Sequence, residues 1–145
     1  MLPPFDSTNG RLPDGEYEVE WQELVERFGW NVRRRQLLDG LAEVVELLAA
    51  AGCRRLWLNG SFVTAKDEPV DFDACWDPDG VDLDMLDPVL LDLSQGRAAQ
   101  KERFGGELFP NVTETKSGLE FAEFFRNERD TGRKGIVVLR IGRQT

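Results

Sequence analysis

The chain has 145 residues, 41% of them hydrophobic, and a formal net charge of −9 at pH 7. This is the size of one ordinary domain, and the hydrophobic content is sufficient for a buried core, which excludes a wholly disordered chain. There is no histidine, which excludes Ser-His-Asp and Cys-His catalytic sites and histidine-based zinc sites. Cys53 and Cys75 lack metal-type spacing and are expected to be reduced and packed in the interior.

The acidic residues are concentrated in one segment. Residues 67–92 contain ten acidic side chains and no lysine or arginine, whereas the rest of the chain has 17 acidic and 18 basic residues. Because the remainder is balanced, no broad basic surface for nucleic acid is expected. The acidic segment either attracts cations or forms a solvated loop. No apolar run is long enough to span a membrane and no signal pattern is visible, so we expect a cytoplasmic protein of bacterial type.

Hydrophobic periodicity and turn-forming residues predict one α/β or α+β domain over residues 1–145. Residues 1–15, rich in turn formers, are expected to be an irregular arm. In chain order, the patterns then predict a helix over 20–28, a helix over about 31–51, a strand over 56–59, a single-turn helix over 61–65, a strand over 70–76, short helical pieces within 82–94, a helix over 96–104, one or two strands within 107–115, a helix over 118–130 and a strand over 135–141. Gly29 is expected to end the helix over 20–28, Asn31 to begin the helix over about 31–51, and Gly105 to end the helix over 96–104.

The most informative stretch is Leu56-Trp57-Leu58-Asn59-Gly60-Ser61, followed after nine intervening residues by Asp71-Phe72-Asp73. A glycine after a strand lets the backbone approach a ligand closely. The start of the following helix presents N–H groups, and Ser61 adds a hydroxyl, so Gly60 and Ser61 are expected to hold the phosphates of a nucleotide.

The pair Asp71 and Asp73 predicts a metal site. A spacing of two places both carboxylates on one face of a strand, while Phe72 faces the core. Adjacent carboxylates suit hard cations such as Mg²⁺ or Mn²⁺, which also take phosphate oxygens as ligands. Two such ions, roughly 3.5–4 Å apart, would activate an attacking hydroxyl and stabilise a leaving pyrophosphate.

At these residues the sequence resembles the DNA polymerase β-type nucleotidyltransferase superfamily. Its signature is a hydrophobic residue, Gly, Gly or Ser, a gap of about nine to thirteen residues, and an acid-hydrophobic-acid triplet. The segments Leu58-Asn59-Gly60-Ser61 and Val70-Asp71-Phe72-Asp73-Ala74 match it. The chain's size resembles the minimal nucleotidyltransferases of bacteria and archaea. The run from Gly60 to Lys66, with Phe104-Gly105-Gly106-Glu107-Leu108-Phe109-Pro110, looks like an uncharacterised bacterial family assigned to that fold.

The resemblance implies a mixed sheet of four or five strands flanked by helices, with its first two strands at 55–59 and 70–76 and the long helix on one face. It also implies a third carboxylate on a later strand, for which Glu107 is the first choice and Glu114 the alternative. Minimal nucleotidyltransferases often carry an arginine soon after the Gly-Ser pair. This chain has Phe62 to Ala65 there, so Lys66 is expected to supply the positive charge.

The function implied is Mg²⁺-dependent transfer of a nucleoside monophosphate from NTP to a hydroxyl of RNA, a protein or a small molecule. Asp71, Asp73 and Glu107 would bind metal and carry catalysis, and Gly60, Ser61 and Lys66 would bind the nucleotide. The alternative is a catalytically inactive module of the same fold, paired with a partner protein in a two-gene toxin–antitoxin or defence unit. The lack of an obvious second domain favours that alternative. The run Arg33-Arg34-Arg35 is interpreted as the solvated side of a helix rather than an RNA contact.

Overall fold

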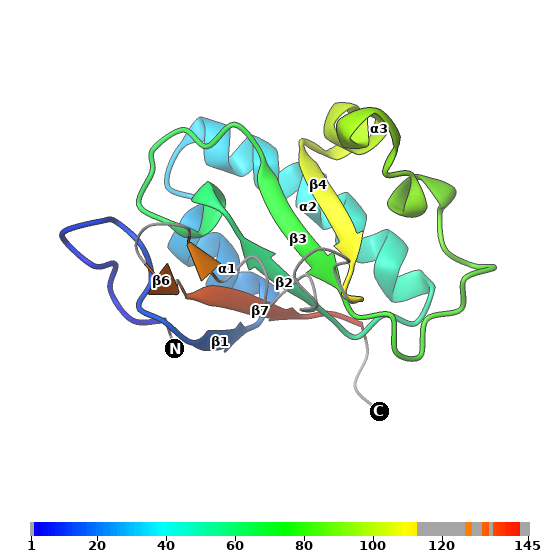
Figure 1. Ribbon diagram of the computed structural model, residues 1–145, viewed down its shortest axis with the longest axis horizontal. Coiled ribbons are helices and arrows are strands. Elements are labelled where there is room, and N and C mark those ends of the chain that lie inside the picture. Colours follow the sequence, from blue (N-terminus) through cyan, green and yellow to red (C-terminus); the bar gives the residue numbers. More distant parts are fainter. Residues whose placement is uncertain (1, 113–126, 129–131, 134, 143–145) are drawn as a thin grey trace.

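Five short strands form one mixed sheet in the computed structural model, which describes residues 2–112, 127–128, 132–133 and 135–142 (Figure 1). In sheet order the strands are β1 (Glu16–Val19), β7 (Ile136–Arg140), β2 (Arg55–Asn59), β3 (Phe72–Trp76) and β4 (Gly106–Pro110). Strand β2 is antiparallel to both of its neighbours, whereas β1 pairs parallel with β7 and β4 pairs parallel with β3. The prediction of a mixed sheet flanked by helices is therefore confirmed. A separate two-stranded sheet joins β5 (Asn127–Glu128) and β6 (Gly132–Arg133).

Capping and terminal residues mark the ends of several helices. The helical elements are α1 (Trp21–Phe28), α2 (Val32–Ala50), the 3₁₀ turns η1 (Ser61–Val63) and η2 (Pro88–Leu91), and α3 (Ser94–Phe104). The Asn31 side chain accepts a hydrogen bond from the backbone N–H of Arg34 and so caps α2. Gly29 follows α1, and Gly105 ends α3 in a left-handed conformation. The helices expected over 20–28 and 31–51 are thus confirmed.

Side-chain alternation separates the two faces of the sheet. Leu56 and Leu58 of β2 pack with the apolar residues of α1 and α2 in the main core, whereas Trp57 between them belongs to a smaller cluster on the other face. That smaller cluster consists of Trp57, Cys75, Ile136 and Val138, with Phe109 packed against it. In Figure 1 the helices α1 and α2 lie behind the sheet. Both cysteines are buried and free, as expected.

Several boundaries differ from the prediction. Strand β1 was not expected, so the strands at 55–59 and 72–76 are the second and third along the chain. The single-turn helix ends at Val63 rather than Ala65, and the strand expected over 70–76 begins at Phe72. Helix α3 begins at Ser94, and its residues Gln95 to Arg97 have left-handed φ and ψ angles. The helix predicted over 118–130 falls mostly outside the described residues, and residues 127–128 within it form a strand.

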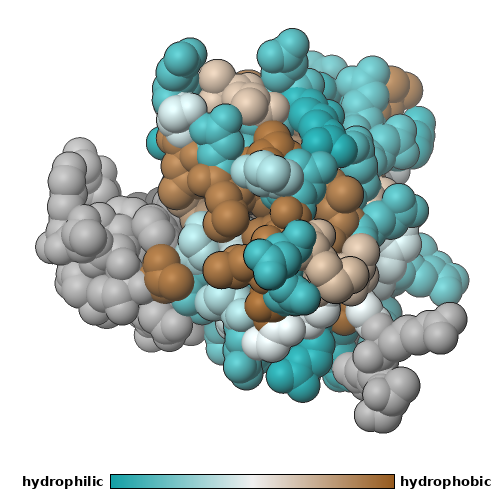
Figure 2. Space-filling model, turned by 90° about the vertical axis from the view of Figure 1, so that its right-hand side faces the viewer, coloured by the Kyte–Doolittle hydropathy of each residue, from teal (hydrophilic) through white to brown (hydrophobic). Residues whose placement is uncertain are grey.

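After β3, the remainder of the acidic segment (residues 77–92) folds into a series of tight turns. The carboxylates of Asp77, Asp82, Asp87 and Asp92 each accept a hydrogen bond from the backbone N–H two residues later. Between these turns several apolar side chains are exposed to solvent, namely Leu83, Met85, Leu91 and Leu93. The face in Figure 2 shows apolar residues gathered at its centre with hydrophilic residues around them. Among the described residues, no helix has the length and apolar character needed to cross a membrane.

Candidate metal centre

Three carboxylates from two neighbouring strands converge at one end of the sheet. Asp71 immediately precedes β3, Asp73 lies within β3, and Glu107 lies in β4, directly opposite Asp73 in the parallel register. One oxygen of each residue lies within 4.8 Å of an oxygen of the others, and all three side chains are half-buried. Three carboxylate oxygens at this separation form a donor set that suits Mg²⁺ or Mn²⁺. Glu107, the first choice for the third carboxylate, thus joins Asp71 and Asp73, whereas Glu114 lies outside the described residues.

The three carboxyl groups have different proton affinities. Burial raises the pKa of Asp71, and the nearby negative charge of Glu107 raises it further, against the opposing effects of Lys101, Arg33 and Lys66. Burial also acts to raise the pKa of Glu107. A hydrogen bond with Asp73 and the charges of Arg97 and Lys101 outweigh this effect, so the pKa of Glu107 lies below its ordinary value.

Two cations from α3 hold Glu107. Arg97 donates from Nε and Nη2 to Glu107 Oε1, at 2.9 and 2.6 Å, and Lys101 Nζ lies 3.4 Å from the same oxygen. Arg97 belongs to a turn at the start of α3 in which the residues from Gln95 to Arg97 have left-handed φ and ψ angles. A backbone in that region is costly for residues other than glycine and is characteristic of functional sites. Sequence reasoning missed both cations, because only the packing of α3 beside β4 brings them to Glu107.

Gly60 is required by the close approach of Asp73. A Cβ atom at residue 60 would lie 2.4 Å from Asp73 Oδ2, which no side chain could tolerate without displacing that carboxylate. The backbone of Gly60 has a φ of 80° and a ψ of −167°, a combination essentially restricted to glycine. The Gly-Ser turn and the carboxylate cluster are therefore parts of one site.

Asn59 is a further member that sequence reasoning did not select. It faces Asp73 across the β2–β3 ladder and is only 1% exposed. Its Nδ2 atom is buried and has no hydrogen-bond partner in the described part of the chain. A buried donor without a partner costs free energy unless an acceptor arrives, so this amide favours a ligand with oxygen acceptors beside Asp73.

Arginines of α2 fix the segment that follows Ser61. The buried Arg34 guanidinium donates to the carbonyls of Phe62, Thr64 and Lys66 at 2.6, 2.6 and 2.7 Å. Arg33 donates to the carbonyls of the residues at 69 and 70, just before Asp71. Burial lowers the pKa of Arg34 to about 10, which leaves it charged at pH 7. The interpretation of this arginine run as a solvated helix side is wrong for Arg34, because the loop carbonyls give the charge buried partners.

Lys66 and Ser61 line a cavity of about 480 Å³ together with Gly60, the residue that the Asp73 carboxylate approaches. The other lining residues are Thr64, Ala65 and three residues of the N-terminal arm, Asn9, Gly10 and Arg11. The helix start expected to bind phosphates is only the three-residue turn η1, too short for a helix-terminus anion site. The structure instead places Ser61 and Lys66 on the lining of one cavity, and their binding of a nucleotide stays a prediction.

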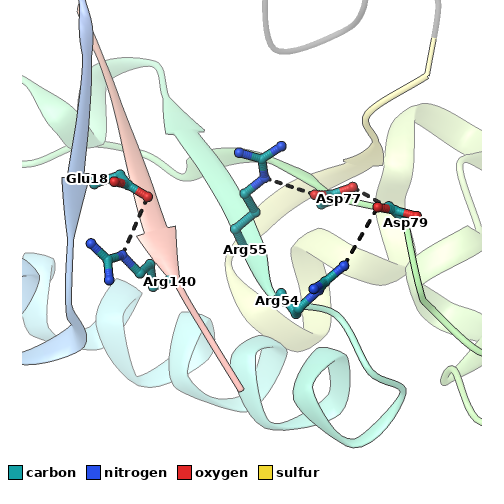
Figure 3. Close-up of a pocket in the computed structure, with 6 residues that line it drawn as sticks. All are labelled: Glu18, Arg54, Arg55, Asp77, Asp79 and Arg140. Carbon is teal, nitrogen blue, oxygen red and sulfur yellow. Dashed lines mark hydrogen bonds and ion pairs between the residues drawn. The ribbon is translucent and has the colours of Figure 1, made fainter. Parts of the chain in front are cut away.

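A second cavity, of about 390 Å³, lies at the opposite end of the sheet (Figure 3). Its lining consists of Glu18, Arg54, Arg55, Asp77, Asp79 and Arg140. Each guanidinium has a carboxylate partner, with N–O distances of 2.9 Å for Arg55 and Asp77, 3.7 Å for Arg54 and Asp79, and 3.4 Å for Arg140 and Glu18. The charges of this cavity therefore neutralise one another, and none of the predicted site residues lies there.

A family model matches residues 3–140, and its description is a family of unknown function (DUF6932). This match spans most of the chain, so the chain belongs to that family. No curated protein and no solved structure shows significant similarity to the chain.

Proposed function

We propose, for this member of a family without an assigned function, that the chain transfers a nucleoside monophosphate from NTP to a hydroxyl group and releases pyrophosphate. The observation that carries the proposal is the convergence of Asp71, Asp73 and Glu107 beside Gly60. Acceptors that fit the reaction are RNA, a protein side chain or a small molecule. The residues present are oxygen donors of the kind that Mg²⁺ and Mn²⁺ prefer, so a divalent cation would fit between them.

In the proposed reaction the acceptor oxygen forms a bond to the α-phosphorus while the bond from that phosphorus to the pyrophosphate oxygen breaks. When bound, Mg²⁺ would lower the pKa of the hydroxyl and neutralise charge on the phosphate oxygens. Asp71, Asp73 and Glu107 would hold the cation, and the hydroxyl proton would pass to a nearby carboxylate or to water.

The test is transfer from each labelled NTP, with Mg²⁺ or Mn²⁺, to cell RNA, cell protein and small-molecule extract. We expect labelled product with the wild-type protein and none with Asp71→Asn/Asp73→Asn, which preserves shape and removes charge. Asp79→Asn is the matched control, because Asp79 is 83% exposed at the far end of the sheet. Product from the double variant at the wild-type rate would contradict the proposal.

A second candidate is a binding module without turnover. The observation that favours it is the occupation of Glu107 by Arg97 and Lys101, since these cations satisfy the carboxylate without metal. Thermal melts with and without Mn²⁺ separate the two. A metal that binds the folded state stabilises it by about 2.7 kcal/mol at a hundredfold excess over Kd. If the protein is the proposed enzyme, Mn²⁺ should raise the Tm of the wild type both with and without a non-hydrolysable NTP, and Asp73→Asn should abolish the rise. If the protein is a binding module, Mn²⁺ should not raise the Tm under either condition.

A further inference from the structure

A polar row crosses the sheet on the face opposite α1 and α2. Along β2, Leu58 packs in the main core and Trp57 in the smaller cluster, so Asn59 lies on the same face as Trp57. Asp73 of β3 lies directly opposite Asn59, and Glu107 of β4 lies directly opposite Asp73. The three strands lie side by side in Figure 1. One amide and two carboxylates of the candidate metal centre are therefore neighbours on one face.

The Asn59 amide has a donor that its apolar neighbours do not satisfy. The side chain is 1% exposed, and its Nδ2 atom has no hydrogen-bond partner among the described residues. Trp57 and Ile136 adjoin it on this face. The indole N–H of Trp57 is itself a donor and contacts Glu16 Oε1 at 3.1 Å. Because neither neighbour has a side-chain acceptor to offer, the acceptor for this amide is expected on the side of the carboxylates.

The Asp73 carboxylate is close to Asn59 but contacts other groups. Residues directly opposite one another in antiparallel strands have Cβ atoms about 4.5–5.5 Å apart, so the two side chains can share one ligand. Asp73 Oδ2 lies so near Gly60 that a Cβ atom there would be 2.4 Å from it, and the carboxylate has a hydrogen bond with Glu107. An oxygen atom placed between Asn59 and the carboxylates would give the buried amide its acceptor.

A phosphate oxygen is the acceptor that fits this position best. A divalent cation has no lone pair for an amide N–H, so a cation bound alone does not satisfy Asn59. Phosphate oxygens commonly complete the coordination of a Mg²⁺ ion that one or two carboxylates hold. A phosphate group in that position has oxygens for both the cation and the amide. Asn59 therefore distinguishes a cation that is bound together with phosphate from a cation that is bound alone.

We propose that Asn59 is a ligand-binding residue whose Nδ2 atom donates to a phosphate oxygen of the nucleotide while the carboxylates hold a divalent cation. The inference rests on the proposed function, because it takes the phosphate to be that of the NTP substrate. It also explains why a buried donor is left without a partner in the free protein. Such a donor lowers the stability of the ligand-free fold and recovers its hydrogen bond on binding.

The first measurement is the Tm of the ligand-free protein in EDTA. Asn59→Leu keeps the branching of the side chain, Asn59→Ala shortens it, and both remove the donor. An amide that waits for a ligand contributes nothing to the free fold, so at least one of the two variants should match the wild-type Tm or exceed it by a few degrees. A lower Tm for both variants would show that the amide already has a stabilising partner, and this would overturn the inference.

The second measurement is calorimetry with two probes, Mn²⁺ alone and inorganic tripolyphosphate in the presence of Mn²⁺. We expect both Asn59 variants to bind Mn²⁺ with wild-type affinity and to bind tripolyphosphate about 10-fold more weakly, the usual loss for one hydrogen bond to a charged group. Trp76→Phe is the matched control. The Nε1 atom of Trp76 is also buried without a partner in the described residues, but it lies in the main core at the other end of β3. Both affinities should be unchanged in this variant.

Three binding results would overturn the inference. They are no binding of tripolyphosphate by the wild type with Mn²⁺, wild-type affinity for it in both Asn59 variants, and equal weakening of Mn²⁺ binding with and without tripolyphosphate. The last would mean that Asn59 only supports the shape of the carboxylate cluster. Nucleotide transfer decides the proposed function separately. Transfer by the wild type, with no effect of Asn59 on tripolyphosphate, would remove Asn59 from the site and leave the reaction in place. A selective effect of Asn59 without transfer would keep the phosphate contact in a protein that only binds.

Discussion

Arg34 determines the course of the chain between Gly60-Ser61 and Asp71. Its side chain is fully buried, and its guanidinium lies 3.7 Å from the Trp30 ring centroid while it donates to five backbone carbonyls. The loop carbonyls, which would otherwise need water, receive their hydrogen bonds from one side chain of α2. The separation of the Gly-Ser turn from the acidic pair is thus fixed by a residue outside both motifs.

Replacing Arg34 by methionine should lower the free energy of unfolding by at least about 3 kcal/mol, because it leaves several buried acceptors without donors. The measurement is urea denaturation. Arg35→Met is the matched control, since Arg35 is exposed and makes one long contact of 3.4 Å with the Gly29 carbonyl, and its effect should stay within about 0.5 kcal/mol. Equal losses for the two variants would show that the loop does not depend on Arg34.

At the residue scale, the sequence supplied the local motifs and missed the distant partners. Gly60, Ser61, Asp71 and Asp73 were found because each sits in a short pattern with a chemical reason. The burial of Arg34 does have a local signal in the sequence. Helical periodicity places it on the same face as Leu37, Leu38 and Leu41, all of which are buried. Arg11, Asn59 and Arg97 have no such signal, since their positions follow from loop contacts and strand register.

Helix α3 is the element that brings cations to Glu107, and α2 positions it. Gly40 of α2 contacts α3 so closely that a Cβ atom at residue 40 would lie 1.8 Å from the Phe104 carbonyl oxygen. The buried Gln100 of α3 donates to the Val89 carbonyl and accepts from the backbone N–H of Leu108, linking η2, α3 and β4. The orientation of Arg97 and Lys101 therefore depends on contacts made along the whole helix.

Gly40→Ala should force α3 away from α2, since the nearest atom is backbone and cannot rotate aside. We expect a loss of about 1–3 kcal/mol or more in unfolding free energy, the cost of overpacking. Asp39→Ala changes the neighbouring exposed residue and should be nearly neutral. Chemical denaturation of the two variants checks this prediction, and a neutral Gly40→Ala would mean that the helices separate without cost.

Helices and strands with a local sequence pattern were predicted, whereas a strand that forms only by pairing with a distant part of the chain was not. Helices α1 and α2 carry caps and apolar periodicity, and β2 carries an apolar run bounded by glycine. Strand β1 has only four residues at a sheet edge, and its partner β7 lies more than a hundred residues later in the chain. Its alternation of charged and apolar residues is too short to outweigh the turn formers before it.

On the scale of the whole molecule, residues 77–92 of the acidic segment form a surface built of turns, separate from Asp71 and Asp73 at the start of the same segment. Its carboxylates stabilise turns, and its apolar side chains divide into buried and exposed ones. Leu90 is 0% exposed, whereas Leu83 is 60% exposed on the same segment. The sequence pattern alone does not separate them, because the segment has neither helical nor strand periodicity over its full length.

Because Leu90 is buried and Leu83 is exposed, replacement by alanine should affect stability differently at the two positions. Leu90→Ala should lower the unfolding free energy by about 2–5 kcal/mol, as expected for a buried leucine, whereas Leu83→Ala should change it by less than about 0.5 kcal/mol. Thermal or urea denaturation measures both. A large loss for Leu83→Ala would show that the exposed apolar residues of this segment are covered in solution.

The position of β7 has a consequence for how the protein is made. It is the last strand of the main sheet in the sequence, yet it lies between β1 and β2 and pairs with both. During synthesis β1 leaves the ribosome first, and β2, β3 and β4 follow and can pair with one another, while β1 has no partner until β7 is translated. Pairing over such long sequence separations is slow. In a nascent chain the sheet would therefore remain open beside β2, exposed to chaperones and to aggregation, until β7 pairs.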